Sequence, residues 1–81
     1  MNTIDKIGDI VRFHRKKAGL TQMELATLAG IGKTALFDVE KGKQTVRLNT
    51  ITAILDVLNI RIQLEGPLIS EWREREGEYQ S

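Results

Sequence analysis

The residues from Lys33 to Asp38 include side chains with the hydrogen-bonding chemistry needed to contact base edges in a DNA duplex. Lys33 can donate to guanine O6 and N7 or to a phosphate, and Thr34 can hydrogen-bond a base or a phosphate oxygen. Ala35 offers only a methyl group. Phe37 either covers a thymine methyl or is an exposed or half-buried aromatic without that role. These contacts require that the residues lie at the start of a helix that is free to enter a major groove.

Asp38 is the least favourable residue of this segment for DNA binding because phosphates repel a carboxylate. It can accept a hydrogen bond from cytosine N4, or it can hold Lys33 or Lys41 in place. We favour the second interpretation, in which Asp38 orients a lysine.

Phosphate contacts are expected on both sides of this segment. Gln22 and the backbone N–H groups at the start of the preceding helix are suited to bind a phosphate oxygen. The polar loop after residue 40 adds further candidates, which are Lys41, Lys43, Thr45 and Arg47. In a dimer these contacts involve on the order of 6–10 phosphates, which predicts a steep dependence of DNA binding on salt.

Residues 21–42 have the spacing of a helix-turn-helix. Ala26 supplies the small residue needed where two helices touch, and Gly30 can adopt the positive φ of the turn. Leu36 and Val39 are the aliphatic residues with which the second helix packs back. The alternative is a plain helical hairpin in a small bundle. We favour the helix-turn-helix because the spacing and the helical periodicity agree.

A first helix, capped by Asn2 or Thr3, is predicted to run to about Lys17. The apolar stripe expected to face the core consists of Ile7, Val11, His14 and Ala18. His14 is interpreted as a helix-packing residue because no nucleophile or metal partner is evident for it. Ile10 and Phe13 form a second apolar strip, which we expect to face a partner because so small a chain has little core to cover both.

Three further helices are expected. Thr21 and Glu24 form a capping box for the second helix. Its apolar contacts are assigned to Met23, Leu25, Leu28 and Ala29. The third helix is predicted over about residues 32–40 and the fourth over about residues 48–58, where Asn59 is a plausible left-handed terminator. The inward residues of the fourth are expected to be Leu48, Ile51, Ile54, Leu55 and Leu58.

After residue 59 the periodicity changes. Ile60, Ile62 and Leu64 alternate with polar residues, which is typical of a β-strand. A lone strand leaves backbone donors and acceptors unpaired, so we predict that it pairs with the same strand of a second copy. The alternative is a fifth helix turn or an extended linker. Residues 67–81 are acidic and can form a short helix from Ser70, but we expect a mobile tail.

Size and composition indicate a small DNA-contacting module rather than an enzyme. The chain has 81 residues, no cysteine and one histidine, so disulfides, thiolate metal sites and a nucleophile–base pair are not expected, and no cofactor is predicted. Residues 1–47 hold nine Lys/Arg against five Asp/Glu, whereas residues 48–81 hold three against six. A basic first part and an acidic second part suggest two different contacts, with phosphate at one end and something else at the other. The alternative is ordinary solvated surface. No apolar run approaches the roughly 20 residues of a membrane span and the start does not resemble a signal peptide, which predicts a cytoplasmic, nucleoid-associated protein.

The string GLTQMELATLAGIGKTALFDVEKGK resembles the XRE class of helix-turn-helix, the class of phage Cro and repressor proteins. Residues 7–64 are more narrowly similar to the HipB antitoxins of bacterial HipBA-type toxin–antitoxin operons, because the fourth helix is followed directly by NIRIQL. This resemblance implies a homodimer that binds palindromic operator DNA and represses its own operon. It also implies a complex in which a HipA-like serine/threonine kinase toxin is neutralised.

Several residues take expected roles from this resemblance. Arg15 and Glu40 fall where the class often has a partly buried ion pair, and Trp72 is a candidate anchor for the toxin. A Trp72 that folds back on the dimer is the alternative. The positions where the class contacts DNA are Gln22, Lys33, Thr34, Phe37, Asp38 and Lys41. Phe37, Asp38 and Gly32 depart from the usual choices, so the operator sequence does not transfer from relatives.

The sequence therefore predicts an all-α, phage-repressor-like bundle of four to five helices with one short C-terminal β-strand that pairs across a homodimer. Residues 1–66 are expected to form the DNA-binding and dimerisation domain, and residues 67–81 the tail. The predicted function is a sequence-specific repressor and HipB-like antitoxin. One rival is a phage-type or restriction-control regulator without a toxin. The other is a protein-interaction adaptor that has lost DNA binding.

Overall fold

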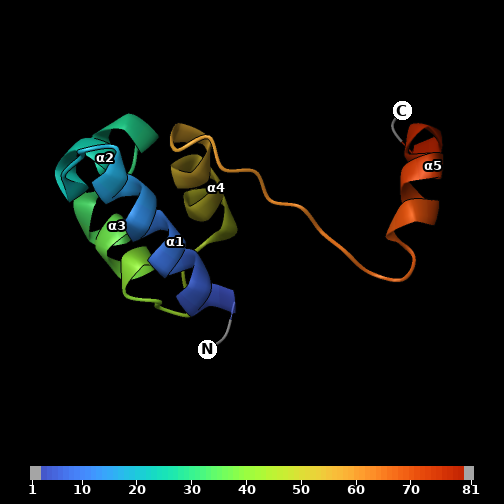
Figure 1. The fold of residues 1–81 in the computed structure, drawn as a ribbon, viewed down its shortest axis with the longest axis horizontal. Helices are drawn as coiled ribbons and strands as arrows, with labels where there is room; N and C mark the ends of the chain where they lie inside the picture. Colours follow the sequence, from blue (N-terminus) through green and yellow to red (C-terminus); the bar gives the residue numbers. More distant parts are fainter. Residues whose placement is uncertain (1–2, 80–81) are drawn as a thin grey trace.

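The computed structural model describes residues 3–79, with side chains described as far as residue 76. This part of the chain contains five helices and no paired strand. They are α1 (Thr3–Lys17), α2 (Gln22–Ala29), α3 (Lys33–Glu40), α4 (Leu48–Val57) and α5 (Ile69–Tyr79). Helices α1 to α4 form one bundle, and α5 stands apart from it at the end of an extended segment (Figure 1). Across residues 3–79, no helix is both long and apolar enough to cross a membrane.

The core of the bundle is aliphatic and draws on all four of its helices. Its buried members are Val11, Leu25, Ala26, Leu36, Val39, Ile51, Ile54 and Leu55. Leu36 and Val39 therefore face inward from α3, as their spacing predicted. Ala26 is almost completely buried beside them, where α2 packs on α3 and α4. Because α3 packs against the core with its inner face, its outer face stays exposed.

The ends of α2 are set by two local signals. Thr21 and Glu24 form the predicted capping box: the Glu24 N–H donates to Thr21 Oγ1 at 3.1 Å, and the Thr21 N–H donates to Glu24 Oε1 at 2.9 Å. At the other end Gly30 has φ 70°, a left-handed conformation that a residue with a Cβ adopts at a cost. The chain consequently turns sharply, and α3 begins three residues later at Lys33.

The inward face of α1 differs from the predicted stripe. Val11 is buried and Ile7 is half-buried, but His14 and Ala18 are exposed, so the prediction of His14 as a packing residue is wrong. Gly8 and Arg15 are buried instead. A Cβ at Gly8 would collide with the carbonyl oxygen of Val39, so the missing side chain lets α1 lie directly against α3. This close approach turns α1 so that Arg15, rather than His14, points inward.

Three apolar residues that were expected to face the core are exposed. Met23 and Leu28 of α2 are 56% and 62% exposed, and Leu48 at the start of α4 is 69% exposed. The short α2 contributes the buried residues Leu25 and Ala26 and the half-buried Ala29 to the core. The other predicted inward residues of α4 are buried or half-buried, and α4 ends at Val57 before Asn59, which has φ 58° as predicted.

Residues 60–66 form an extended segment that leaves the bundle beside the end of α4 (Figure 1). Ile60 packs against the core, whereas Ile62 and Leu64 are 52% and 68% exposed. Within this one chain the segment is extended but is not paired as a strand, so strand pairing across a dimer stays a prediction. The acidic segment after Pro67 forms helix α5; its mobility and the proposed domain boundary also stay predictions.

Candidate nucleic-acid interface

Helix α3 presents one exposed face beside its buried one. Leu36 and Val39 point into the core, while Lys33 and Thr34 are exposed at the N-terminal end and Phe37 is 44% exposed one turn later. Lys33, Phe37 and Lys41 follow at intervals of four residues and therefore share a side of the helix. The Lys41 Nζ lies 5.0 Å from the centroid of the Phe37 ring. Phe37 is thus partly covered by a lysine side chain.

A polar groove of about 290 Å³ lies where α3 meets α1 and α2. Arg12 and Lys16 from α1 line one side of it, and Gln22, Phe37 and Lys41 line the other. We call it the α1-side groove; Arg15 and Glu40 complete its lining. Within residues 3–76, the cations Arg12, Lys16 and Lys41 form no ion pair with a carboxylate, which makes the groove suited to an anion such as a phosphate oxygen of DNA.

A second groove, of about 210 Å³, flanks α3 on the side of the loop that leads to α4. Lys43, Thr45 and Arg47 from the loop line it, together with Ala35 and Asp38 from α3. We call it the loop-side groove; Val46 and Thr50 complete its lining. The exposed face of α3 therefore lies between two grooves that both carry basic side chains. This arrangement suits a helix that lies in a major groove with a phosphate backbone on each side.

Asp38 forms an ion pair with a lysine, but not with either of the lysines expected from the sequence. Lys43 Nζ lies 3.5 Å from Asp38 Oδ2, and it is this loop lysine rather than Lys33 or Lys41 that Asp38 holds. The prediction of the partner is wrong because it considered neighbours on the same helix. The loop after Gly42 returns Lys43 to the side of α3 on which Asp38 lies.

A buried ion pair connects α1 to the end of α3. Arg15 Nε donates to Glu40 Oε2 at 2.7 Å and Arg15 Nη2 donates to Glu40 Oε1 at 3.1 Å, so the pair predicted from the resemblance is present and bidentate. The hydrogen bond to Glu40 raises the pKa of Arg15. The same Glu40 oxygen accepts from Gln22 Nε2 at 3.2 Å. Glu40 thereby holds Gln22 at the floor of the α1-side groove.

Arg12 and Lys16 line the α1-side groove, although sequence reasoning did not single them out as candidate contacts. Two signals for these residues were available. Arg12 and Lys16 lie four residues apart on α1, and both are near Arg15, which the resemblance already placed against the end of α3. The remaining predicted contacts, Thr34, Lys43, Thr45 and Arg47, are all exposed.

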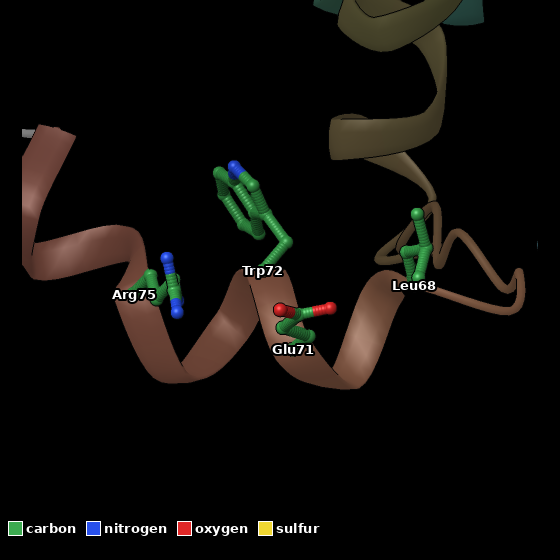
Figure 2. Close-up of a pocket in the computed structure, with 4 residues that line it drawn as sticks. All are labelled: Leu68, Glu71, Trp72 and Arg75. Atoms are coloured by element: carbon green, nitrogen blue, oxygen red, sulfur yellow. The ribbon is translucent and has the colours of Figure 1, made fainter.

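The residues predicted for protein contacts lie on two separate surfaces. Ile10 and Phe13 are 39% and 59% exposed on the outside of α1. Trp72 is 51% exposed on α5, where it projects from the helix between Leu68 and Arg75 (Figure 2). Neither surface belongs to the two grooves beside α3. The two grooves and the exposed apolar residues are thus separate surfaces.

Comparison with known proteins identifies the family. The Helix-turn-helix family HTH_3 matches residues 11–64. The chain is 38% identical over 61 residues to the uncharacterized HTH-type transcriptional regulator y4mF of Sinorhizobium fredii, with 75% of this chain and 80% of that protein covered. The chain therefore belongs to the XRE-type helix-turn-helix family of transcriptional regulators, whose members in general are not enzymes.

Two further proteins are similar to the chain. The immunity repressor protein of Bacillus phage phi105 is 31% identical over 78 residues, which cover 93% of this chain and 52% of the repressor. The chain thus spans about half the length of that repressor. The HipB chain of the solved HipA-HipB-O2-O3 complex matches with a TM-score of 0.73 at 24% identity, covering 82% of this chain and 93% of that chain. At this identity the match shows a shared fold.

Proposed function

We propose that the chain is a sequence-specific DNA-binding repressor. The observation that carries the proposal is the exposed face of α3 between two grooves with basic linings. Lys33 and Thr34, with Phe37, would meet base edges, while the α1-side and loop-side grooves would each receive a phosphate backbone. The similarity to a phage immunity repressor supports the repressor role.

The test is a gel shift with the promoter of the chain's own gene, performed at two salt concentrations and with a scrambled promoter as control. We expect binding to the promoter that is tighter than binding to the scrambled DNA and that weakens steeply with salt. Equal binding to both DNAs would contradict sequence specificity. An absence of binding to either would favour the adaptor that has lost DNA binding.

Lys33→Ala tests whether the start of α3 reads a base. If Lys33 contacts a guanine, the substitution should cost about 1–3 kcal/mol and relax specificity at one operator position. The measurement is a binding series over operator variants with each base pair changed in turn. A loss that is uniform across all variants would mean that Lys33 contacts a phosphate.

A homodimer is part of the proposal because two α3 helices must be spaced along the DNA. In a twofold dimer the two α3 helices would contact half-sites about 34–36 Å apart. The extended and exposed residues Ile62 and Leu64, which have no strand partner in the described part of the chain, support pairing with a second copy. Deleting residues 60–81 should weaken the dimer in sedimentation equilibrium. A fragment 1–59 that dimerises as well as the full chain would contradict the strand pair.

We further propose that the chain is the antitoxin of a HipBA-type module and works in the cytoplasm at its own operon. The HipB-like fold and the residues 7–64 that resemble HipB support this role. The test of this role is a neighbouring reading frame for a kinase-like toxin, with co-purification of that toxin and the chain. Trp72→Ala would test whether Trp72 anchors the toxin. A gene without such a neighbour would favour the phage-type regulator, which the similarity to the phi105 repressor supports.

A further inference from the structure

Two apolar surfaces remain exposed in the single chain, and the first lies on α1. Ile10 and Phe13 form its centre, and Lys6 and Lys17 lie on the same side of the helix at either end. We call these four residues the α1 strip. The Lys17 Nζ lies 5.8 Å from the centroid of the Phe13 ring, so the charge adjoins the apolar centre.

The second apolar surface is formed by α5 and the extended segment before it. Ile62 and Leu64 are 52% and 68% exposed, and Leu68 and Trp72 are 68% and 51% exposed. We call these four residues the C-terminal surface. A hollow of about 450 Å³ lies between the extended segment and Trp72. Leu68 and Trp72 also border a second hollow along α5 (Figure 2).

The two surfaces carry opposite charges at the same spacing in the sequence, with Glu65 in the extended segment and Glu76 on α5. Helix α1 has five basic residues against two acidic ones, whereas α5 has four glutamates against two arginines. Lys6 and Lys17 stand seven residues before and four residues after Phe13. Glu65 and Glu76 stand seven residues before and four residues after Trp72. An aromatic centre between two lysines is thus matched by an aromatic centre between two glutamates.

The path of the chain favours a contact between two copies over a contact within one. Helix α5 stands away from its own α1 (Figure 1), and Arg73 Nη2 donates to the Leu64 carbonyl oxygen at 3.0 Å, which ties α5 to the extended segment. In an antiparallel pair of these segments, Leu64 of one copy would lie near Ile60 of the other. Since Ile60 packs on its own bundle, each α5 would begin beside the bundle of the partner.

We propose that in the homodimer the C-terminal surface of each copy docks on the α1 strip of the other, with Trp72 covering Phe13. The proposal rests on the dimer proposed above and adds a second pair of contacts to it. Twofold symmetry makes the contact twice, once for each α5. Trp72 would then serve the dimer, and the acidic character of α5 would match the basic face that it covers.

The test uses the fluorescence of Trp72, which is the only tryptophan in the chain. The full chain is diluted across its dimerisation range while sedimentation equilibrium reports the fraction of dimer. If α5 docks, the emission should shift to shorter wavelength in parallel with dimer formation, because the indole leaves water. The Phe13→Ala variant should weaken the dimer by about tenfold. At concentrations where this variant is fully dimeric, its emission should stay at long wavelength.

Met23→Ala is the matched control, since Met23 is an exposed apolar residue on α2 outside both surfaces. It should change neither the dimer nor the emission. Charge reversal supplies a second variant: Lys6→Glu with Lys17→Glu should weaken the dimer, and adding Glu65→Lys with Glu76→Lys should restore it. The rescue is expected whether α5 lies parallel or antiparallel to the α1 of the partner, because both ends of each surface carry the same charge.

The outcomes separate this contact from the dimer itself. A full chain that dimerises while Trp72 emission stays at long wavelength would overturn the docking and leave the strand pair intact. Emission that shifts only after a kinase toxin is added would also overturn it and would assign Trp72 to the toxin. A chain that stays monomeric at every concentration would overturn both the docking and the proposed dimer.

Discussion

At the residue scale, a few buried polar and glycine positions decide how the interface is held. Arg15 and Glu40 are both largely shielded from water, at 11% and 4% side-chain exposure, and each satisfies the other. Arg15 also donates to the Leu20 carbonyl oxygen at 2.9 Å. Because Glu40 in turn holds Gln22, one buried pair fixes the relative positions of α1, α2 and α3 beneath the α1-side groove.

Arg15→Ala should destabilise the fold strongly because it leaves Glu40 buried without a cation. Breaking one side of a buried ion pair typically costs about 3–5 kcal/mol of unfolding free energy. Urea denaturation of the variant measures this loss. Arg12→Ala, a neighbouring arginine in the exposed lining of the groove, is the control and should change stability little. Equal effects of the two substitutions would contradict the structural role of Arg15.

Gly8→Ala should also destabilise, although alanine favours helices over glycine by about 1 kcal/mol. The added Cβ would collide with the Val39 carbonyl oxygen, and inserting atoms into a packed contact typically costs about 1–3 kcal/mol. The net loss is measured by thermal or urea unfolding. Asp9→Ala at an exposed position of the same helix should be close to neutral. A stabilised Gly8→Ala variant would mean that α1 and α3 have room to separate.

At the scale of the element, α2 is a short helix whose start depends on its capping box. The Thr21 backbone N–H donates to the Glu24 carboxylate, and the Thr21 hydroxyl oxygen accepts from the Glu24 backbone N–H. The hydrogen bond from the Thr21 backbone lowers the pKa of Glu24. The carboxylate therefore favours the folded state, in which α2 supplies Gln22 to the interface. Helix α3 lacks such a cap, because Gly32 offers no side-chain hydrogen bond to its first turn.

The stability that Glu24 contributes should depend on pH. Since the pKa of Glu24 is lower in the folded than in the unfolded chain, its contribution is present above the pKa of the unfolded chain and is lost as the pH falls through the pKa of the folded chain. Glu24→Gln is the matched control because glutamine completes the capping box without titrating there. Denaturation of both proteins between neutral and acid pH should show an extra loss for the wild type alone. Parallel curves would contradict this account.

At the scale of the whole molecule, the charge asymmetry corresponds to a division of surfaces. The basic side chains of α1, α3 and the following loop line the two grooves beside α3, while the acidic residues of the second part concentrate on α5. Helix α5 stands apart from the bundle that carries the two grooves (Figure 1), so its negative charge does not oppose an anion bound there. DNA and a protein partner could therefore be bound at the same time.

The salt dependence of DNA binding should reflect the number of phosphates that contact the two grooves. With on the order of 6–10 phosphates contacted by a dimer, the logarithm of the affinity should fall with log[salt] at a slope of about −5 to −9. Arg12→Ala and Lys16→Ala should each lower the magnitude of this slope by about one for every phosphate that the variant no longer binds. Arg75→Ala on α5 is the control and should leave the slope unchanged. An unchanged slope in the α1 variants would remove α1 from the interface.

The local elements could be read from the sequence because their signals are local. The capping box at Thr21 and Glu24, the turn at Gly30 and the inward pair Leu36 and Val39 each depend on residues within a few positions of one another. The family resemblance supplied one distant pair, Arg15 with Glu40. Together these features determined the helix-turn-helix and the helix that carries the candidate contacts.

Only the tertiary structure decided which surfaces those elements share. Packing of Gly8 against Val39 turned α1 so that Arg15 points inward and His14 faces water, and this brought Arg12 and Lys16 beside Lys41. The return of the loop gave Asp38 its partner. Such contacts join residues far apart in sequence, and helical periodicity does not specify how one helix is rotated against another. The sequence therefore determined the motif, whereas the fold determined the two grooves beside α3.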